Sequence, residues 1–172
     1  MKLATITVRL LALAVFACGG NAYAAKGHVH GAGTLDVSIE GNKVSLALEL
    51  PLDAATGFER APKTPQEKAA LEEAGKVLNN AATLFTMSPA ANCTVGSVNV
   101  TVPYSTTSTA NAEHADLAGN YVFQCANPAA LTRIETTLFK QFKRLYRLEV
   151  RRVGPGGQGA SRLTPKQPTL SW

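Results

Sequence analysis

Residues 34–50 read TLDVSIEGNKVSLALEL and predict a β-hairpin. Apolar and polar side chains alternate on both sides of Gly41-Asn42, which is typical of strands buried on one face. The apolar positions on that face are Leu35, Val37, Ile39, Val44, Leu46, Leu48 and Leu50. Because a Gly-Asn pair suits the tight turns of hairpins, we expect two antiparallel strands here.

A helix is predicted after the hairpin. Thr64-Pro65-Gln66-Glu67 combines an N-cap residue, a proline in the first turn and a glutamate at N3, which together form a capping box. Apolar residues then recur at spacings of three and four: Ala70, Leu71, Ala74, Val77, Leu78 and Ala81. This stripe predicts an amphipathic helix that covers one face of the sheet.

The rest of the chain predicts more strands and a second helix. The expected strands are 93–102, 114–125, 146–153, 159–163 and 168–172. Asn127-Pro128 repeats the cap-and-proline start, and an apolar stripe at helical spacing follows it: Leu131, Ile134, Leu138, Phe142 and Leu145. The predicted fold class is α+β: a single domain with a mostly antiparallel β-sheet and two amphipathic helices on one face. The predicted order is ββαββαβ plus one or two short strands.

The composition limits the possible functions. The chain has 172 residues, of which 45% are hydrophobic and 17% charged, enough for the core of one domain. Its net charge of +5 is a mild excess, not the dense basic face of a nucleic-acid binder. The one long apolar run, residues 10–17, is too short to cross a bilayer, which excludes a transmembrane bundle.

The N-terminus predicts an export signal, residues 1–24, that is cleaved from the mature chain. Lys2 and Arg9 supply the positive region, residues 10–17 the apolar region, and residues 22–24 (AYA) the small-x-small site of signal peptidase. Residues 25–172 are therefore expected to form a single periplasmic domain.

The cysteines fit this compartment. Cys18 ends a poor lipoprotein cleavage box, in which Phe16 is bulky where a small residue is needed, so lipid anchoring is the less favoured alternative. Loss of the signal leaves Cys93 and Cys125 as an even pair, for which a disulfide is expected. Closing that loop should stabilise the fold by about 3–4 kcal/mol. Metal ligation is the alternative, but the pair lacks the close spacing of a zinc knuckle.

Gly27-His28-Val29-His30-Gly31 is the candidate metal-binding segment. In an extended backbone His28 and His30 lie on one side, and their imidazoles suit zinc, copper or nickel. A site needs three or four ligands, and the further candidate donors are His114, Glu113, Asp116 and Glu59. The alternative is that both histidines are merely solvated. If processing exposed Lys26, its amine and His28 could instead enclose Cu²⁺ or Ni²⁺ in a square plane.

A cluster of basic residues is the second candidate surface: Lys140, Lys143, Arg144, Arg147, Arg151 and Arg152. They could be a solvated face that complements the dipole at the end of the second helix. Alternatively, Lys143, Arg144, Arg147 and Arg151 could contact anionic lipid or an acidic partner protein; nucleic acid is not expected. The chain has no nucleophile elbow, phosphate loop or H-E-x-x-H motif, so no enzymatic activity is expected.

Scattered motifs along the mature chain resemble those of the ZrgA family of zinc-regulated periplasmic proteins. They include residues 28–31 (HVHG), 35–37 (LDV), 57–59 (GFE), 61–64 (APKT), 114–116 (HAD), 121–125 (YVFQC), 157–160 (GQGA) and 163–165 (LTP). The resemblance implies a zinc-binding protein that supports zinc acquisition beside an ABC-type importer, with His28, His30 and His114 as ligands.

The chain also departs from the family pattern. Family members usually hold a histidine- and acid-rich tract before the second cysteine, whereas residues 103–113 contain no histidine here. Two functions are therefore expected from the sequence. The first is a non-enzymatic periplasmic zinc-binding protein whose affinity falls in acid, because only neutral imidazole binds a metal. The alternative is a disulfide-stapled envelope interaction module without a metal.

Overall fold

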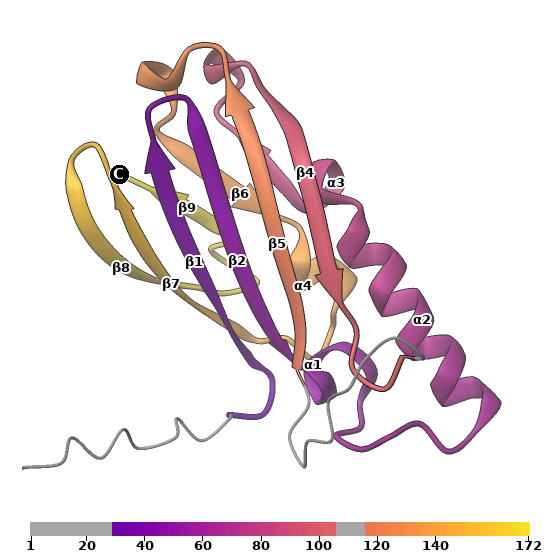
Figure 1. Ribbon diagram of the computed structural model, residues 1–172. Coiled ribbons are helices and arrows are strands. Elements are labelled where there is room, and N and C mark those ends of the chain that lie inside the picture. The colour runs from indigo at the N-terminus through magenta and orange to yellow at the C-terminus, as the bar shows by residue number, and fades with distance from the viewer. Residues whose placement is uncertain (1–28, 106–115) are drawn as a thin grey trace, which may run out of the picture.

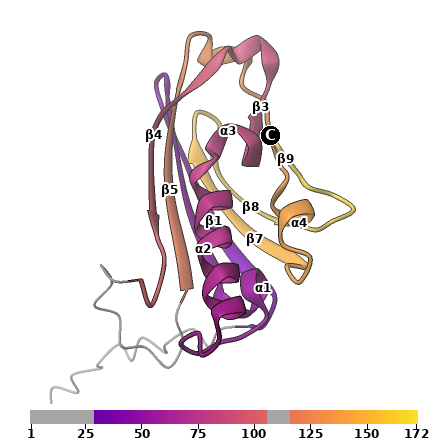
Figure 2. The same ribbon diagram turned by 90° about the vertical axis from the view of Figure 1, so that its right-hand side faces the viewer.

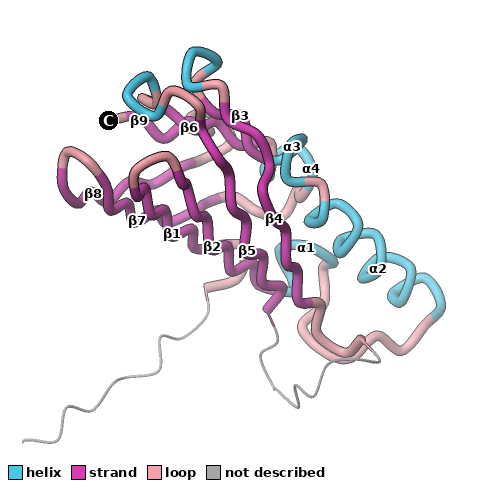
Figure 3. The backbone as a smooth tube through the Cα atoms, turned by 45° about the horizontal axis from the view of Figure 1, so that its top comes forward, coloured by secondary structure: helices cyan, strands magenta, loops and turns pink. Residues whose placement is uncertain are grey.

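The computed structural model describes residues 29–105 and 116–172 of the chain. It is an α+β domain, as predicted, and its main element is a six-stranded sheet in the order β4-β5-β2-β1-β7-β8 (Figure 1 and Figure 3). The strands are β1 (Ala32–Glu40), β2 (Lys43–Pro51), β4 (Cys93–Thr101), β5 (Asp116–Cys125), β7 (Arg147–Gly154) and β8 (Gly157–Leu163). The predicted signal, 1–24, and the histidines at 28 and 114 lie outside the described residues.

The predicted hairpin is confirmed as β1 and β2. The two strands pair antiparallel, with Thr34 opposite Glu49 and Ile39 opposite Val44 across the Gly41-Asn42 turn. All neighbouring strands of the large sheet are antiparallel except β1 and β7, which are parallel. The alternating apolar side chains of the hairpin are buried. The alternation of apolar and polar residues in the hairpin therefore determines which face of the sheet packs against the core.

The predicted first helix is confirmed as α2 (Pro65–Asn79). Its capping box is complete, because Thr64 Oγ1 accepts from the Glu67 N–H at 3.1 Å and the Glu67 carboxylate accepts from the Thr64 N–H at 3.2 Å. Its buried side includes Leu71 and Leu78. Three shorter helices are α1 (Leu52–Thr56), α3 (Ala81–Leu84) and α4 (Leu138–Gln141).

A second, three-stranded sheet completes the core. It has the order β3-β6-β9 and consists of β3 (Phe85–Met87), β6 (Arg133–Thr136) and β9 (Thr169–Ser171). Figure 2 shows this sheet and the helices on one side of the large sheet. The opposite side of the large sheet carries no helix within the described residues. No helix in the described ranges is long and apolar enough to cross a membrane.

The predicted second amphipathic helix is wrong. The segment contains a short 3₁₀ turn (Pro128–Ala130), the strand β6 and the single turn α4. In β6 the buried positions alternate, Ile134 and Thr136 facing the core. β-branched residues favour strands, and β6 gains hydrogen-bonded neighbours from β3 and β9, which lie far away in the sequence. This long-range pairing outweighs the local helical spacing.

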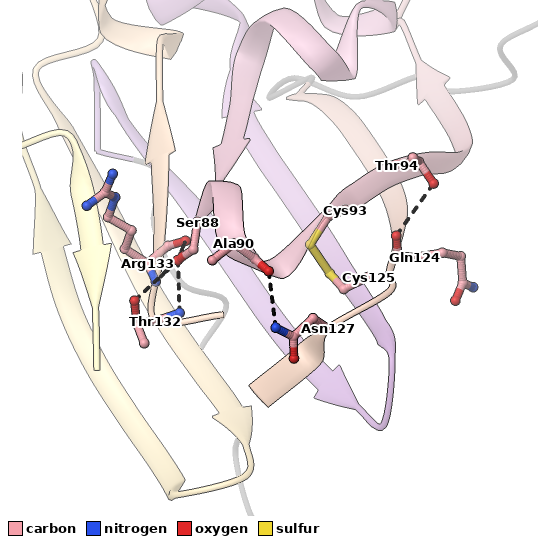
Figure 4. Close-up of a disulfide and its surroundings, with 9 residues drawn as sticks. All are labelled: Ser88, Ala90, Cys93, Thr94, Gln124, Cys125, Asn127, Thr132 and Arg133. Carbon is pink, nitrogen blue, oxygen red and sulfur yellow. Dashed lines mark hydrogen bonds between the residues drawn. A yellow bond between two sulfur atoms is a disulfide. The ribbon is translucent and has the colours of Figure 1, made fainter. Parts of the chain in front are cut away.

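The predicted disulfide between Cys93 and Cys125 is confirmed. The two residues are directly opposite each other in the β4–β5 register (Figure 4). Nearby, the buried Ser88 accepts hydrogen bonds through Oγ from the N–H groups of Thr132 and Arg133, both at 3.0 Å. The disulfide joins the start of β4 to the end of β5, and Ser88 joins the end of β3 to the start of β6.

Candidate metal centre

His30, Asp53 and Glu59 converge at one end of the large sheet. His30 lies two residues before β1, Asp53 lies in α1 directly after β2, and Glu59 lies in the connection from α1 to α2. Because β1 and β2 are antiparallel, the start of β1 lies beside the end of β2, near the foot of the sheet in Figure 1. The hairpin register therefore brings together residues that are more than twenty positions apart in the sequence.

The three side chains have the spacing of metal ligands. His30 Nδ1 lies 2.9 Å from Glu59 Oε1 and 3.4 Å from Asp53 Oδ2. One ligand atom from each residue lies within 4.8 Å of the others. Bonds of about 2.1 Å from zinc to nitrogen or oxygen place tetrahedral donors about 3.4 Å apart, so an ion needs only small side-chain movements here.

The three ligands differ in exposure. The side chain of His30 is 74% exposed, whereas those of Glu59 and Asp53 are 34% and 19% exposed. The carboxylates thus form the floor of the site and the imidazole its open side. A centre with three protein ligands and an open side leaves coordination positions for water or for a ligand from another molecule.

Asp53 is oriented by the backbone at the start of β1. Its Oδ2 accepts a hydrogen bond from the Gly31 N–H at 3.1 Å, the kind of contact that fixes the direction of a metal-binding carboxylate. Its Oδ1 is buried and accepts no hydrogen bond from the part of the chain that the structure describes, and a buried unpaired oxygen is costly. A bound cation would compensate the charge of this carboxylate.

Glu59 is held between two fixed points of its loop. On one side Gly57, at φ +88°, donates its N–H to the Asp53 carbonyl at 2.9 Å. On the other side Arg60 binds both carboxylate oxygens of Glu67, at 2.7 and 3.0 Å. Glu67 also accepts from the Lys63 N–H at 2.6 Å. These hydrogen bonds, Arg60 foremost, lower the pKa of Glu67 to about 2.

The predicted ligands are only partly placed. His30 and the further donor Glu59 lie in the cluster, whereas His28, Glu113 and His114 lie outside the described residues. The further donor Asp116 lies at the start of β5, paired in register with Pro51. Sequence reasoning missed Asp53. The sequence could have pointed to Asp53, because it is an acidic residue just after the second strand of the hairpin. That end of the second strand lies beside the start of the first strand, which His30 precedes.

Within residues 29–105 and 116–172, this cluster is the one group of three histidine, cysteine, aspartate or glutamate side chains whose ligand atoms converge. A hollow of about 640 Å³ lies elsewhere, on the uncovered face of the large sheet. Its lining is mostly small or apolar and includes Ser45, Ala47, Asn120 and Val122. That hollow brings together no comparable set of ligands among the described residues.

The predicted basic residues do not flank a long helix. The apolar stripe that suggested a helix contains the strand β6, and α4 is a single turn that ends at Gln141. The explanation that these cations complement the dipole of a long helix is therefore wrong. Arg151 binds Asp36 at 2.6 and 2.7 Å on one face of β7, and Arg152 lies buried on the other face, 5.0 Å from the centre of the Trp172 ring. The basic cluster is therefore divided between two faces.

Two of the predicted partner-binding residues lie near the candidate ligands or the backbone that supports them. Arg144 packs against Gly57, since a Cβ built on that glycine would lie 2.9 Å from Arg144 Nε. Arg147 follows Tyr146, whose N–H donates to the Gly31 carbonyl at 3.0 Å. Lys143 is exposed in the turn that precedes β7. Whether these residues bind a partner stays a prediction.

Residues 27–172 match the sequence model of a family described as ZrgA family zinc uptake protein. The match covers the whole of the described structure. Among curated proteins, no sequence matches the chain.

Proposed function

The chain belongs to the ZrgA family, and on this premise we propose that it is a non-enzymatic zinc-binding protein of the periplasm that supports zinc uptake. The observation that carries the proposal is the convergence of His30, Asp53 and Glu59 at the end of the β1–β2 hairpin. The family description concerns zinc, and an imidazole with two carboxylates is a donor set that zinc accepts.

His28 and His114 are proposed as additional ligands. Each lies two positions along the chain from a described residue of this end of the sheet, His28 from His30 and His114 from Asp116. One further imidazole would give four protein ligands, the number typical of a closed zinc site. Copper and nickel also bind imidazole, so they are the competing metals.

The periplasmic location is supported by two features. The first 24 residues have the three regions of an export signal. The Cys93–Cys125 disulfide suits an oxidising compartment. We propose a component of a zinc-uptake system as the partner, and a free mature N-terminus in preference to a lipid anchor on Cys18.

The experiment is a zinc titration against a competing chelator. The protein should be secreted through its own signal, with its N-terminus and disulfide verified by intact mass. Wild type is compared with His30→Ala, Glu59→Gln and the double variant His28→Ala/His30→Ala. Glu72→Gln is the matched control, because Glu72 is an exposed carboxylate of α2 outside the cluster.

We expect one zinc ion per chain with a dissociation constant of about 1 μM or lower, and at least tenfold weaker binding in the three site variants. Glu72→Gln should bind as wild type does. Equal affinity in wild type and His28→Ala/His30→Ala would contradict the site. In that case the alternative, an interaction module without a metal, would be favoured.

A further inference from the structure

Exposed apolar and basic side chains border the candidate metal centre. Val29 and Tyr146 are each 49% exposed, and they are two of the five large apolar residues exposed in the described structure. Lys143 and Arg144 are exposed in the turn before β7. We call these four residues the basic rim.

The basic rim is continuous with the metal ligands. Val29 adjoins His30 in the chain, and the Tyr146 N–H donates to the carbonyl of Gly31, the next residue after His30. The Tyr146 ring also packs on Gly31, where an added Cβ would lie 2.8 Å from the ring. Together with the Arg144–Gly57 contact, these interactions place the basic rim against both strand β1 and the loop that carries Glu59.

Among the residues that the structure describes, no acidic side chain neutralises the cations of the basic rim. Within the described residues, the side chains of Lys143 and Arg144 form no ion pair, whereas Arg147 pairs with Glu149 at 3.2 Å and Arg151 with Asp36. The Arg147 guanidinium also lies over the Tyr146 ring, 5.6 Å from its centre, in a cation–π contact. An aromatic ring and an arginine at a solvent-exposed position are the residue types enriched in protein interfaces.

We propose that the basic rim is the docking surface for an acidic segment of a partner protein, whose carboxylates come to lie beside the metal centre. The unpaired cations supply electrostatic complementarity, and Tyr146 and Val29 supply the apolar contact. A second copy of this chain is a poor occupant, because residues 25–172 keep a net positive charge of +3 (15 basic and 12 acidic residues). An anionic membrane would be attracted by the same two cations, and the test below separates it from an acidic segment of a protein.

The metal and the partner should bind cooperatively. This step rests on the proposed zinc site, which has an open side beside the basic rim. A bound Zn²⁺ would add positive charge beside Lys143 and Arg144 and offset the carboxylates of Asp53 and Glu59, so zinc should tighten the docking of an acidic segment. By thermodynamic linkage the partner should then tighten zinc binding by the same factor.

The test uses a fluorescent ten-residue polyglutamate peptide as the probe, with binding followed by anisotropy. Wild type is compared with Lys143→Glu/Arg144→Glu and with the control Lys43→Glu/Lys166→Glu. The control makes the same change in net charge at exposed residues of the β1–β2 turn region and the β8–β9 connection. Each protein is measured without metal and with saturating Zn²⁺, and its melting temperature is recorded to verify folding.

We expect the basic-rim variant to bind the peptide about tenfold or more weakly, while the control changes by less than about threefold. Zinc should tighten the peptide complex of wild type but not that of His30→Ala. Equal losses in both charge variants would overturn the proposal. Tighter binding to phosphatidylglycerol vesicles than to the peptide would also overturn it, as would a wild-type dimer that the basic-rim variant dissociates.

Peptide binding without metal tests the basic rim on its own. If the rim-dependent binding is present but zinc has no effect, the docking surface stands and the cooperativity is refuted. If zinc does not bind wild type in the chelator titration, the proposed function fails separately.

Discussion

The backbone N–H of Gly31 donates to Oδ2 of Asp53 at 3.1 Å, which ties the start of β1 to helix α1. The same carboxylate oxygen lies 3.4 Å from His30 Nδ1. One side chain therefore both holds the hairpin to the helix and faces the imidazole of the candidate centre. Substitutions at this position can separate the two roles.

Asp53→Asn should weaken zinc binding without unfolding the protein. The amide oxygen can still accept from Gly31, but a neutral amide is a poorer zinc ligand, so the zinc dissociation constant should rise about tenfold or more. Asp53→Ala should lose zinc binding to a similar extent and also lower the free energy of unfolding by about 1 kcal/mol. Chelator titration and urea denaturation separate these effects; full zinc affinity in Asp53→Asn would exclude Asp53 as a ligand.

Glu67→Gln should weaken zinc binding although Glu67 lies outside the converging ligands. Glu67 holds Arg60 and the Lys63 N–H, and so fixes one end of the loop that presents Glu59. We expect the zinc dissociation constant to rise severalfold. Thr64→Ala is the matched control, because it removes the N-cap hydroxyl but leaves the Arg60–Glu67 pair. If both variants lower zinc affinity equally, helix capping alone explains the effect.

The same carboxylate should give a distinct dependence of stability on pH. Its pKa is lowered from 4.5 to about 2 in the folded protein, chiefly by the hydrogen bond from Arg60. A group whose pKa is lower in the folded state stabilises the fold above its unfolded pKa, and this contribution is lost as the pH falls through the folded pKa. The difference in unfolding free energy between wild type and Glu67→Gln should thus be constant above about pH 5 and shrink between pH 4.5 and about 2. A difference that does not change over this range would contradict the assignment.

The double variant Cys93→Ala/Cys125→Ala should lose stability but keep its zinc affinity. Cross-linking a loop of this length contributes about 3–4 kcal/mol, to be measured by chemical denaturation. The disulfide lies near the β1–β2 turn, since the Cys125 N–H donates to the Asn42 carbonyl at 2.8 Å, whereas the candidate ligands lie at the other end of the hairpin. A large loss of zinc affinity in the folded variant would mean that the two ends are coupled.

Tyr121→Phe should leave the protein as stable as wild type or make it more stable. The Tyr121 hydroxyl is buried and has no hydrogen-bond partner among the described residues, and burial raises the pKa of this phenol. Removing an unsatisfied buried hydroxyl should increase the free energy of unfolding by up to about 1 kcal/mol, as measured in urea. The ring remains packed on Phe85, with their centres 5.1 Å apart. A loss above about 1 kcal/mol would indicate that the hydroxyl has a partner in solution.

Local patterns predicted the elements whose signals lie within a few residues. The alternation on both sides of Gly41-Asn42 predicted the hairpin, and the Thr64–Glu67 capping box predicted where α2 begins. In each case the stabilising hydrogen bonds and apolar contacts join residues that are close in the sequence, so the local sequence is enough to predict the element. The pairing of Cys93 with Cys125 also followed from the sequence, because removal of the predicted export signal would leave these two cysteines as one even pair.

Long-range pairing decided the rest. The segment around Ile134 has helical spacing, but it forms β6 because β3 and β9 offer hydrogen bonds on both sides. In the same way, the sequence suggested His30 and Glu59 as ligands but not Asp53, and it did not show that the three meet. Their convergence depends on the β1–β2 register and on α1 turning back beside the start of β1, contacts between residues far apart in the sequence. The sequence by itself determined the hairpin, α2 and the disulfide, whereas only the tertiary structure decided which side chains form one site.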